Sequence, residues 1–425
     1  MPYVKTIHGW HGHQIDYANA FCQAPVREDM YISIPPGFRI PGVNHKDRSE
    51  YCLKLNMSLY GSRTSPRNWF LTKRESLIRR GFKPSKIDPC LFINEQRGLL
   101  CCVYVDDCLI FAPDRATLVN FMMELKQEFD LTAEDSIEDY LGVRVSFNER
   151  HNTVTLSQTG LIDKILSTVF PSAGEYVKPH YTPAVDPPLG RDDDGSESNV
   201  EWSYRSVIGS LLYLANNTRP DIMFAVHQAA RFSSHPKQSH HLAVKRICRY
   251  LYATKDKGLI FSPQENNLQC FVDADFAGLW KTKEFDLPSS CLSRSGYVIL
   301  YAGAPLLWVS KLQTEIALST TEAEYIALSH SMRDLIPTKH LLHELAVFFN
   351  IPAPDMVTSC TVFEDNASAQ QLALCPKLRP RTKHIGIKYH FFRNHVQNGS
   401  IQVKFVPSGL QIADIFYESV ASSNF

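Results

Sequence analysis

Two adjacent aspartates that interrupt a long apolar run constrain the fold of this chain more than any other feature. The run Leu99–Val105 stops at Asp106 and Asp107, and apolar residues resume at Cys108–Ala112. Two apolar strands joined by a short acidic turn form a β-hairpin, which places both carboxylates at its tip. An ordinary Asp-containing turn explains a lone pair of this kind, so a metal site requires further acids.

A candidate strand near the start of the chain, residues 13–21, carries a third acid, Asp16. Phosphoryl transfer by two metal ions requires carboxylates from separate strands at one edge, where they hold two hard cations about 3.5–4 Å apart. We therefore predict that Asp16 meets Asp106 and Asp107 in one site.

The C-terminal part of the chain contains a second series of acids. Hydrophobic periodicity predicts strands at 268–274, 295–301, 305–310, 358–364 and 401–406, and helices at 320–349, 367–374 and 388–398. The acids stand where these elements begin or end: Asp273, Asp275, Glu322, Glu324, Asp365 and Asp414. An acid in the first turn of a helix is often only a partner of the helix dipole, which is the alternative for Glu322. An acid after a strand often caps the next helix, which is the alternative for Asp365.

The chain of 425 residues is longer than one typical domain, so we expect it to consist of several parts. Residues 181–203 are rich in Pro, Asp, Gly and Ser, which is typical of a linker. Helical spacing interrupted by Pro220 and Pro236 predicts three helices between residues 204 and 252. The expected parts are 1–180, 181–203, 204–263 and 264–425.

Charge and cysteine content narrow the class of protein. The formal net charge is zero, but Lys and Arg gather in three stretches, at 63–86, 245–257 and 377–393. Each stretch lies beside a carboxylate motif, which favours phosphate contact over an ordinary solvated face. The eleven cysteines form no metal-type pairs, so we interpret them as free thiols of an intracellular protein. No apolar run predicts secretion or a membrane span.

The combined motifs resemble the reverse transcriptase and RNase H region of copia-type LTR retrotransposon Pol polyproteins over nearly the whole chain. The N-terminal matches are DYANAF at 16–21, YISIPPGF at 31–38, LYGSRTSPRNW at 59–69 and YVDD at 104–107. The C-terminal matches include EYIA at 324–327 and RTKHI at 381–385.

The resemblance implies a mixed α/β (α+β) fold in three parts. Residues 1–180 would form a right-hand polymerase palm and thumb-like region, 204–263 a helical connection, and 264–425 an RNase H-like mixed-sheet domain. Fifteen residues precede Asp16, so the fingers are expected to be largely missing and the chain N-terminally truncated.

The implied function is RNA-directed DNA polymerase with ribonuclease H activity, by two-metal phosphoryl transfer. The implied partners are an RNA template, a DNA primer, RNA–DNA hybrid, deoxynucleoside triphosphates and other retroelement proteins. The implied location is a cytoplasmic virus-like particle, the nucleus, or both. The alternative is an inactive remnant that at most binds nucleic acid.

The resemblance also assigns residues. Two Mg²⁺ or Mn²⁺ ions per site would be held by seven acids: Asp16, Asp106 and Asp107, and then Asp273, Glu324, Asp365 and Asp414. Glu324 is preferred to Glu322 because it fits the Glu-x-x-Ala pattern, and Asp275 is the alternative to Asp273. The nucleotide-binding residues would be Phe21, Tyr60 and Gly61, with a core aromatic as the alternative for Phe21. The nucleic-acid-binding residues would be Arg63, Arg67, Arg381, Lys383 and His384, where His384, like His390, could be an ordinary histidine.

Two departures from the family pattern stand near these residues. Ser62 and Thr64 replace the usual Leu and Gln beside the nucleotide pocket. Tyr417 and Glu418 follow Phe416 where the family has Thr-Lys. We expect the second departure to affect packing after the last acid more than the acid itself.

Overall fold

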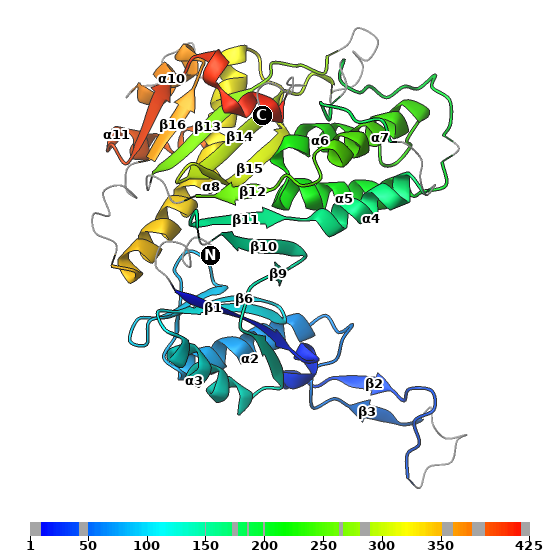
Figure 1. Cartoon of the computed structure of the whole chain (residues 1–425), viewed down its shortest axis with the longest axis vertical. Coiled ribbons are helices and arrows are strands. Elements are labelled where there is room, and N and C mark those ends of the chain that lie inside the picture. The colour runs from blue at the N-terminus through cyan, green and yellow to red at the C-terminus, as the bar shows by residue number, and fades with distance from the viewer. Residues whose placement is uncertain are drawn as a thin grey trace. The chain divides into compact units, whose positions relative to one another are not determined.

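The computed structural model describes residues 10–41, 50–148, 150–171, 177–184, 187–198, 200–262, 267–280, 290–350, 360–375 and 387–417. The chain forms two compact units, Met1–Leu141 and Gly142–Phe425. Both units combine helices with β-sheet, as the predicted mixed α/β class requires (Figure 1). Among the helices of the described segments, none is long and apolar enough to cross a membrane.

The first unit is built on a six-stranded antiparallel sheet with the order β4-β5-β6-β7-β1-β8. Its strands are β1 (His11–Tyr17), β4 (Lys83–Pro84), β5 (Leu91–Asn94), β6 (Leu99–Tyr104), β7 (Asp107–Ala112) and β8 (Leu131–Glu134). The helices α2 (Ser65–Arg79) and α3 (Arg115–Lys126) contribute to the core on one face of this sheet. The remaining elements are η1 (Ala20–Gln23), the β2 (Tyr31–Ser33) and β3 (Cys52–Lys54) pair, and β9 (Asp139–Tyr140).

Residues from 142 onward belong to the second unit, whereas the expected polymerase part extends to residue 180. β10 (Val143–Asn148) pairs with β11 (Thr153–Ser157), and β11 pairs with β12 (Leu259–Phe261). α4 (Thr159–Val169) buries its apolar face in the core of the second unit. α4 thus packs with helices that lie downstream of it in the sequence, and the boundary expected at residue 180 stays a prediction.

The three helices predicted between residues 204 and 252 are confirmed. They are α5 (Tyr204–Asn217), α6 (Met223–Ala230), preceded by η3 (Pro220–Ile222), and α7 (Gln238–Ala253). The segment expected to be a linker packs along α7. His240 Nε2 lies 2.8 Å from Gly190 O, and Gln238 N donates to Ser196 O at 3.0 Å.

A five-stranded mixed sheet with the order β15-β14-β13-β16-β17 completes the second unit (Figure 1). Its strands are β13 (Leu268–Ala274), β14 (Arg294–Tyr301), β15 (Ala304–Leu312), β16 (Cys360–Glu364) and β17 (Ile401–Phe405). β13, β14 and β15 are antiparallel, whereas β13, β16 and β17 are parallel. Parallel strands end at one edge of a sheet, so the residues that close β13 and β16 lie close together.

The helices of this region follow the predicted order with small shifts. α8 (Thr320–Phe348) packs on β13 and β14, and α10 (Ala367–Leu374) follows β16. The helix predicted at 388–398 forms as η7 (Ile387–His390) and α11 (Arg393–Gln397). The chain then passes through η8 (Ser408–Leu410) to η9 (Ile412–Phe416), which is a short 3₁₀ helix.

Candidate active sites

The first site, formed by Asp16, Asp106 and Asp107, lies where β1 meets the tip of the β6–β7 hairpin. Asp107 is paired with Tyr104 across the hairpin and with Asp16 of β1. Tyr17 N donates to Asp106 O at 3.1 Å and joins β1 to the turn. Opposite residues of an antiparallel pair have Cβ atoms about 4.5–5.5 Å apart. The predicted meeting of these strands is therefore confirmed.

The turn of the hairpin depends on an uncommon backbone conformation. Val105 has a φ of 47°, which a β-branched residue rarely adopts. Two side chains of α2 donate to its carbonyl oxygen, Trp69 Nε1 at 2.6 Å and Lys73 Nζ at 2.9 Å. Trp69 and Lys73 are four residues apart and therefore lie on one face of the helix, so their spacing could have predicted that they contact the same group.

Lys73 belongs to the first basic stretch, for which we expected phosphate contact. Its side chain is instead buried, with Nζ 4.4 Å from the centroid of the Tyr17 ring and 3.0 Å from Cys108 Sγ. The expectation is wrong for this residue, because the buried ammonium stabilises the turn and cannot reach a phosphate in solvent.

The charges of the first site act on one another. Burial raises the pKa of Asp107, and the carboxylates of Asp106 and Asp16 raise it further. Asp16 is exposed, and the two turn aspartates are partly exposed. The three groups thus repel one another at a solvent-facing edge.

The predicted nucleotide-binding residues form a contact beside η1. The rings of Phe21 and Tyr60 have centroids 4.6 Å apart, and half of Tyr60 is exposed. Gly61 has a φ of 90°, and a Cβ there would meet no atom within 4 Å, so glycine is favoured by conformation, not by space. Arg63 and Arg67 are exposed on the same segment.

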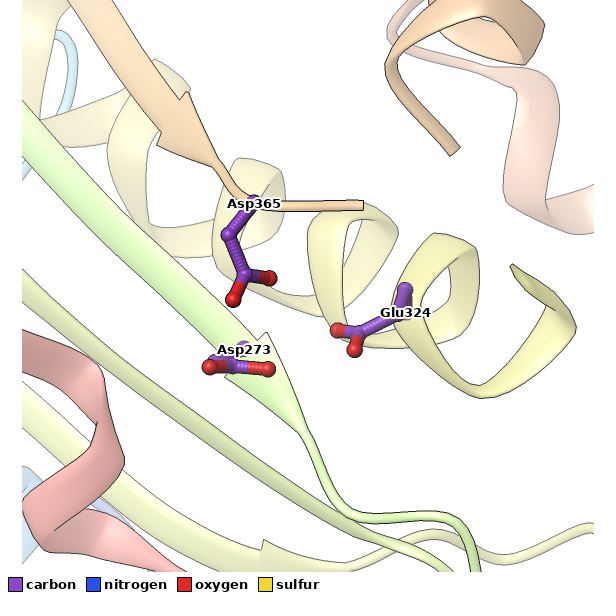
Figure 2. Close-up of side chains that lie close together, drawn as sticks. All are labelled: Asp273, Glu324 and Asp365. Carbon is purple, nitrogen blue, oxygen red and sulfur yellow. The ribbon is translucent and has the colours of Figure 1, made fainter. Parts of the chain in front are cut away.

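The second site gathers carboxylates from β13, α8 and the end of β16 (Figure 2). Asp273, Glu324 and Asp365 each present an oxygen within 4.8 Å of the others. β13 and β16 are parallel neighbours and bring two of these acids to one edge, while α8 packs on β13 and adds Glu324. Within the described segments, no other three acids are gathered this closely, those of the first site included.

Asp414 joins the second site from η9. Tyr417 Oη donates to Asp273 Oδ2 at 2.9 Å and lies 3.3 Å from Asp414 Oδ1. The expectation that Tyr417 would affect packing more than the acid is wrong, because its hydroxyl contacts both carboxyl groups.

The alternatives to Glu324 and Asp273 have structural roles. Glu322 accepts a hydrogen bond from Leu318 N at 2.8 Å, which agrees with its interpretation as a residue of the helix N-terminus. Asp275 accepts a hydrogen bond from Arg294 N at 2.5 Å and so bonds to the neighbouring strand β14.

Comparison of the sequence with known proteins identifies the family of this chain. The reverse transcriptase (RNA-dependent DNA polymerase) family matches residues 4–184. The chain is 34% identical to the retrovirus-related Pol polyprotein from transposon RE1 of Arabidopsis thaliana, over 99% of this chain and 27% of that protein. It is 30% identical to the corresponding polyprotein from transposon TNT 1-94 of Nicotiana tabacum, over 97% of this chain and 30% of that protein. The chain belongs to the copia-type Pol polyprotein family.

This Pol chain spans about a quarter of the length of the curated relatives it matches. Among solved structures, LC11-RNase H1, isolated from compost, is similar at 18% identity with a TM-score of 0.24, over 36% of this chain and 92% of that chain.

The Pol chain has a further buried acid, Glu364, which is not among the predicted site residues. Glu364 is fully buried, and its Oε2 has no hydrogen-bond partner among the described residues. Side chains alternate along a strand, so Cys360, Val362 and Glu364 share the buried face of β16. This period of two in the sequence could have predicted that Glu364 is buried. The neighbouring Asp365 instead accepts a hydrogen bond from Ser408 Oγ at 2.7 Å.

The buried acids of the Pol chain are poorly compensated. Burial raises the pKa values of Asp273, Glu324, Glu364 and Asp414. Glu324 Oε2 is buried and, within the described segments, has no hydrogen-bond partner. Carboxylate oxygens are the ligands that Mg²⁺ and Mn²⁺ prefer, and a divalent cation would compensate this charge. The residues of the second site therefore fit divalent cations.

Three predicted nucleic-acid-binding residues of the Pol chain, Arg381, Lys383 and His384, lie outside the described residues. His390 lies inside them, and its Nδ1 is 2.8 Å from Tyr325 Oη. This contact supports the interpretation of His390 as an ordinary packed histidine.

Proposed function

We propose that the second unit of this Pol chain cleaves the RNA strand of an RNA–DNA hybrid. The observation that carries this proposal is the convergence of Asp273, Glu324 and Asp365 within 4.8 Å, with a buried Glu324 oxygen that lacks a described partner. Buried acids that lie together must either be protonated or have their charge compensated, as by a cation. A mixed sheet with two added parallel strands, as observed here, is also the arrangement expected of an RNase H-like domain.

Two Mg²⁺ or Mn²⁺ ions would be held by Asp273, Glu324, Asp365 and Asp414. Such ions activate an attacking water and stabilise charge on the phosphate. The chain itself orients the acids: Ser408 donates to Asp365, and Gln411 Nε2 donates to Val272 O at 2.9 Å, which holds η9 against β13. The fold thereby presents the acids without a large rearrangement.

We further propose that the first site extends a DNA primer on an RNA template, with Asp16, Asp106 and Asp107 holding two divalent cations. The cross-strand pairing of Asp16 with Asp107 supports this proposal. The Phe21–Tyr60 contact offers an aromatic surface for the sugar and base of a deoxynucleoside triphosphate. The exposed Arg63 and Arg67 would contact phosphates of the template or primer.

Cleavage of a labelled RNA–DNA hybrid by the purified chain tests the leading proposal. We expect cleavage with Mg²⁺, none with EDTA, and none in the Asp365→Asn variant. Asp275→Asn is the matched control, because Asp275 bonds to Arg294 N and lies outside the group of three acids. Undiminished cleavage by Asp365→Asn would overturn the site assignment. Hybrid binding without cleavage by the unaltered chain would instead favour an inactive remnant.

A further inference from the structure

The hydroxyl of Tyr417 lies where two acids of the second site meet. It donates to Asp273 Oδ2 at 2.9 Å and is 3.3 Å from Asp414 Oδ1. A hydroxyl has one hydrogen to donate, and its oxygen adds no positive charge. A cation bound by the same two carboxylate oxygens would have to replace this hydroxyl.

Close packing of η9 on the sheet puts Tyr417 in this place. Gly296 is paired with Asp273, and a Cβ at position 296 would lie 2.8 Å from Phe416 Cβ. The carbonyl of Phe416 accepts a hydrogen bond from Ser310 Oγ. These contacts fix the end of η9 over the strand that carries Asp273, so the next residue, Tyr417, reaches both acids.

The second site therefore has two unequal positions for a cation. The three-acid position is formed by Asp273, Glu324 and Asp365, whose oxygens lie within 4.8 Å of one another. Glu324, one of its three acids, also has a buried oxygen, Oε2, without a hydrogen-bond partner among the described residues. The Asp273–Asp414 position, by contrast, already has the Tyr417 hydroxyl against both carboxyl groups.

We propose that Tyr417 makes the two positions differ in affinity: the three-acid position binds Mg²⁺ or Mn²⁺ directly, and the Asp273–Asp414 position binds a second ion only when the Tyr417 hydroxyl withdraws. This inference rests on the proposed hybrid cleavage by two metal ions. It makes Tyr417 a positioning residue that sets how much divalent metal the reaction requires.

Calorimetric titration of the full chain with Mn²⁺ tests this proposal. The chain would carry Asp106→Asn and Asp107→Asn, so that the first site does not bind the ion. We expect one tighter and one weaker Mn²⁺ site. Tyr417→Phe should tighten the weaker site by about three- to tenfold, the gain from losing one competing hydrogen bond, and leave the tighter site unchanged. Tyr417→Thr should also tighten the weaker site, and it keeps the test valid if Tyr417→Phe does not fold.

Asp414→Asn is the matched control and should remove the weaker site only. A second Mn²⁺ that appears only in Tyr417→Phe would also support the proposal. The proposal would be overturned if the affinity of the weaker Mn²⁺ site were unchanged or reduced in both Tyr417 variants. It would also be overturned if neither the unaltered chain nor any variant bound a second ion. Hybrid cleavage by Asp365→Asn judges the proposed function separately, so failure of one proposal is distinguishable from failure of the other.

Discussion

The two acidic sites differ in how the fold holds their carboxylates. At the first site, strand pairing fixes the backbones of Asp16 and Asp107, but the side chains stay at a solvent-facing edge. At the second site, Asp273 and Glu324 are 3% and 7% exposed, and packing itself gathers their oxygens. At the first site, strand pairing brings the backbones together without fixing the carboxylates. At the second site, packing brings the carboxylates themselves together, and their negative charge then has to be compensated.

The largest expected effect is a reciprocal loss of two activities. Asp106→Asn should reduce primer extension on an RNA template by about 100-fold or more, because a metal ligand is lost, and should leave hybrid cleavage unchanged. Asp365→Asn should do the opposite. Both activities would be measured on the same preparations. Loss of both activities in either variant would show that the two sites are not independent.

Divalent metal should stabilise the second unit more than the first. A ligand at 100 times its dissociation constant stabilises a folded state by about 2.7 kcal/mol. Scanning calorimetry with Mg²⁺ or EDTA should therefore show a higher melting temperature with Mg²⁺ for the chain carrying Asp106→Asn and Asp107→Asn. The gain should disappear when Asp365→Asn is added. An equal gain without Asp365 would place the stabilising ion elsewhere.

Lys73→Met should weaken the first site through its turn. The change keeps the length of the side chain but removes the donor that bonds to Val105 O at 2.9 Å. We expect primer extension to fall by about tenfold, equivalent to one hydrogen bond to a charged group, with hybrid cleavage unchanged. Lys83→Met, at an exposed lysine of β4, is the control. A similar loss in both variants would argue against a role for the turn.

The smallest effect concerns pH. Burial raises the folded-state pKa of Glu364, so its stabilising contribution is complete below about pH 4 and is lost as the pH rises through the folded value. Glu364→Gln removes this titration. In EDTA, the free energy of unfolding from urea titrations should fall less steeply from pH 4 to 8 in the variant than in the unaltered chain. An identical slope in both proteins would show that Glu364 is not held protonated.

Much of this arrangement could be predicted from sequence, because local pattern determined it. Alternation and strand ends located Asp273 and Asp365, and two parallel strands necessarily end at one edge. The choice of Glu324 over Glu322 came from the family resemblance and not from local pattern, and Glu322 accepts a hydrogen bond from Leu318 N at the start of α8.

The remaining features depend on tertiary contacts that no local pattern records. Lys73 looks like a surface lysine until α2 packs on the hairpin. From sequence, α4 was grouped with the first part of the chain, but the apolar residues on which it packs come later in the sequence. Tyr417 reaches the acids because η9 is a 3₁₀ helix pressed on Gly296, and neither fact is visible in the sequence around it.

Anomalous diffraction from crystals of the chain soaked in Mn²⁺ tests the central claim most directly, because it locates the ions without relying on activity. We predict a strong peak among the carboxylate oxygens of Asp273, Glu324 and Asp365, and a weaker peak, or none, between Asp273 and Asp414. A Mn²⁺ ion bound instead by Asp275 or Glu322, or no ion at the three-acid position at saturating Mn²⁺, would contradict the account.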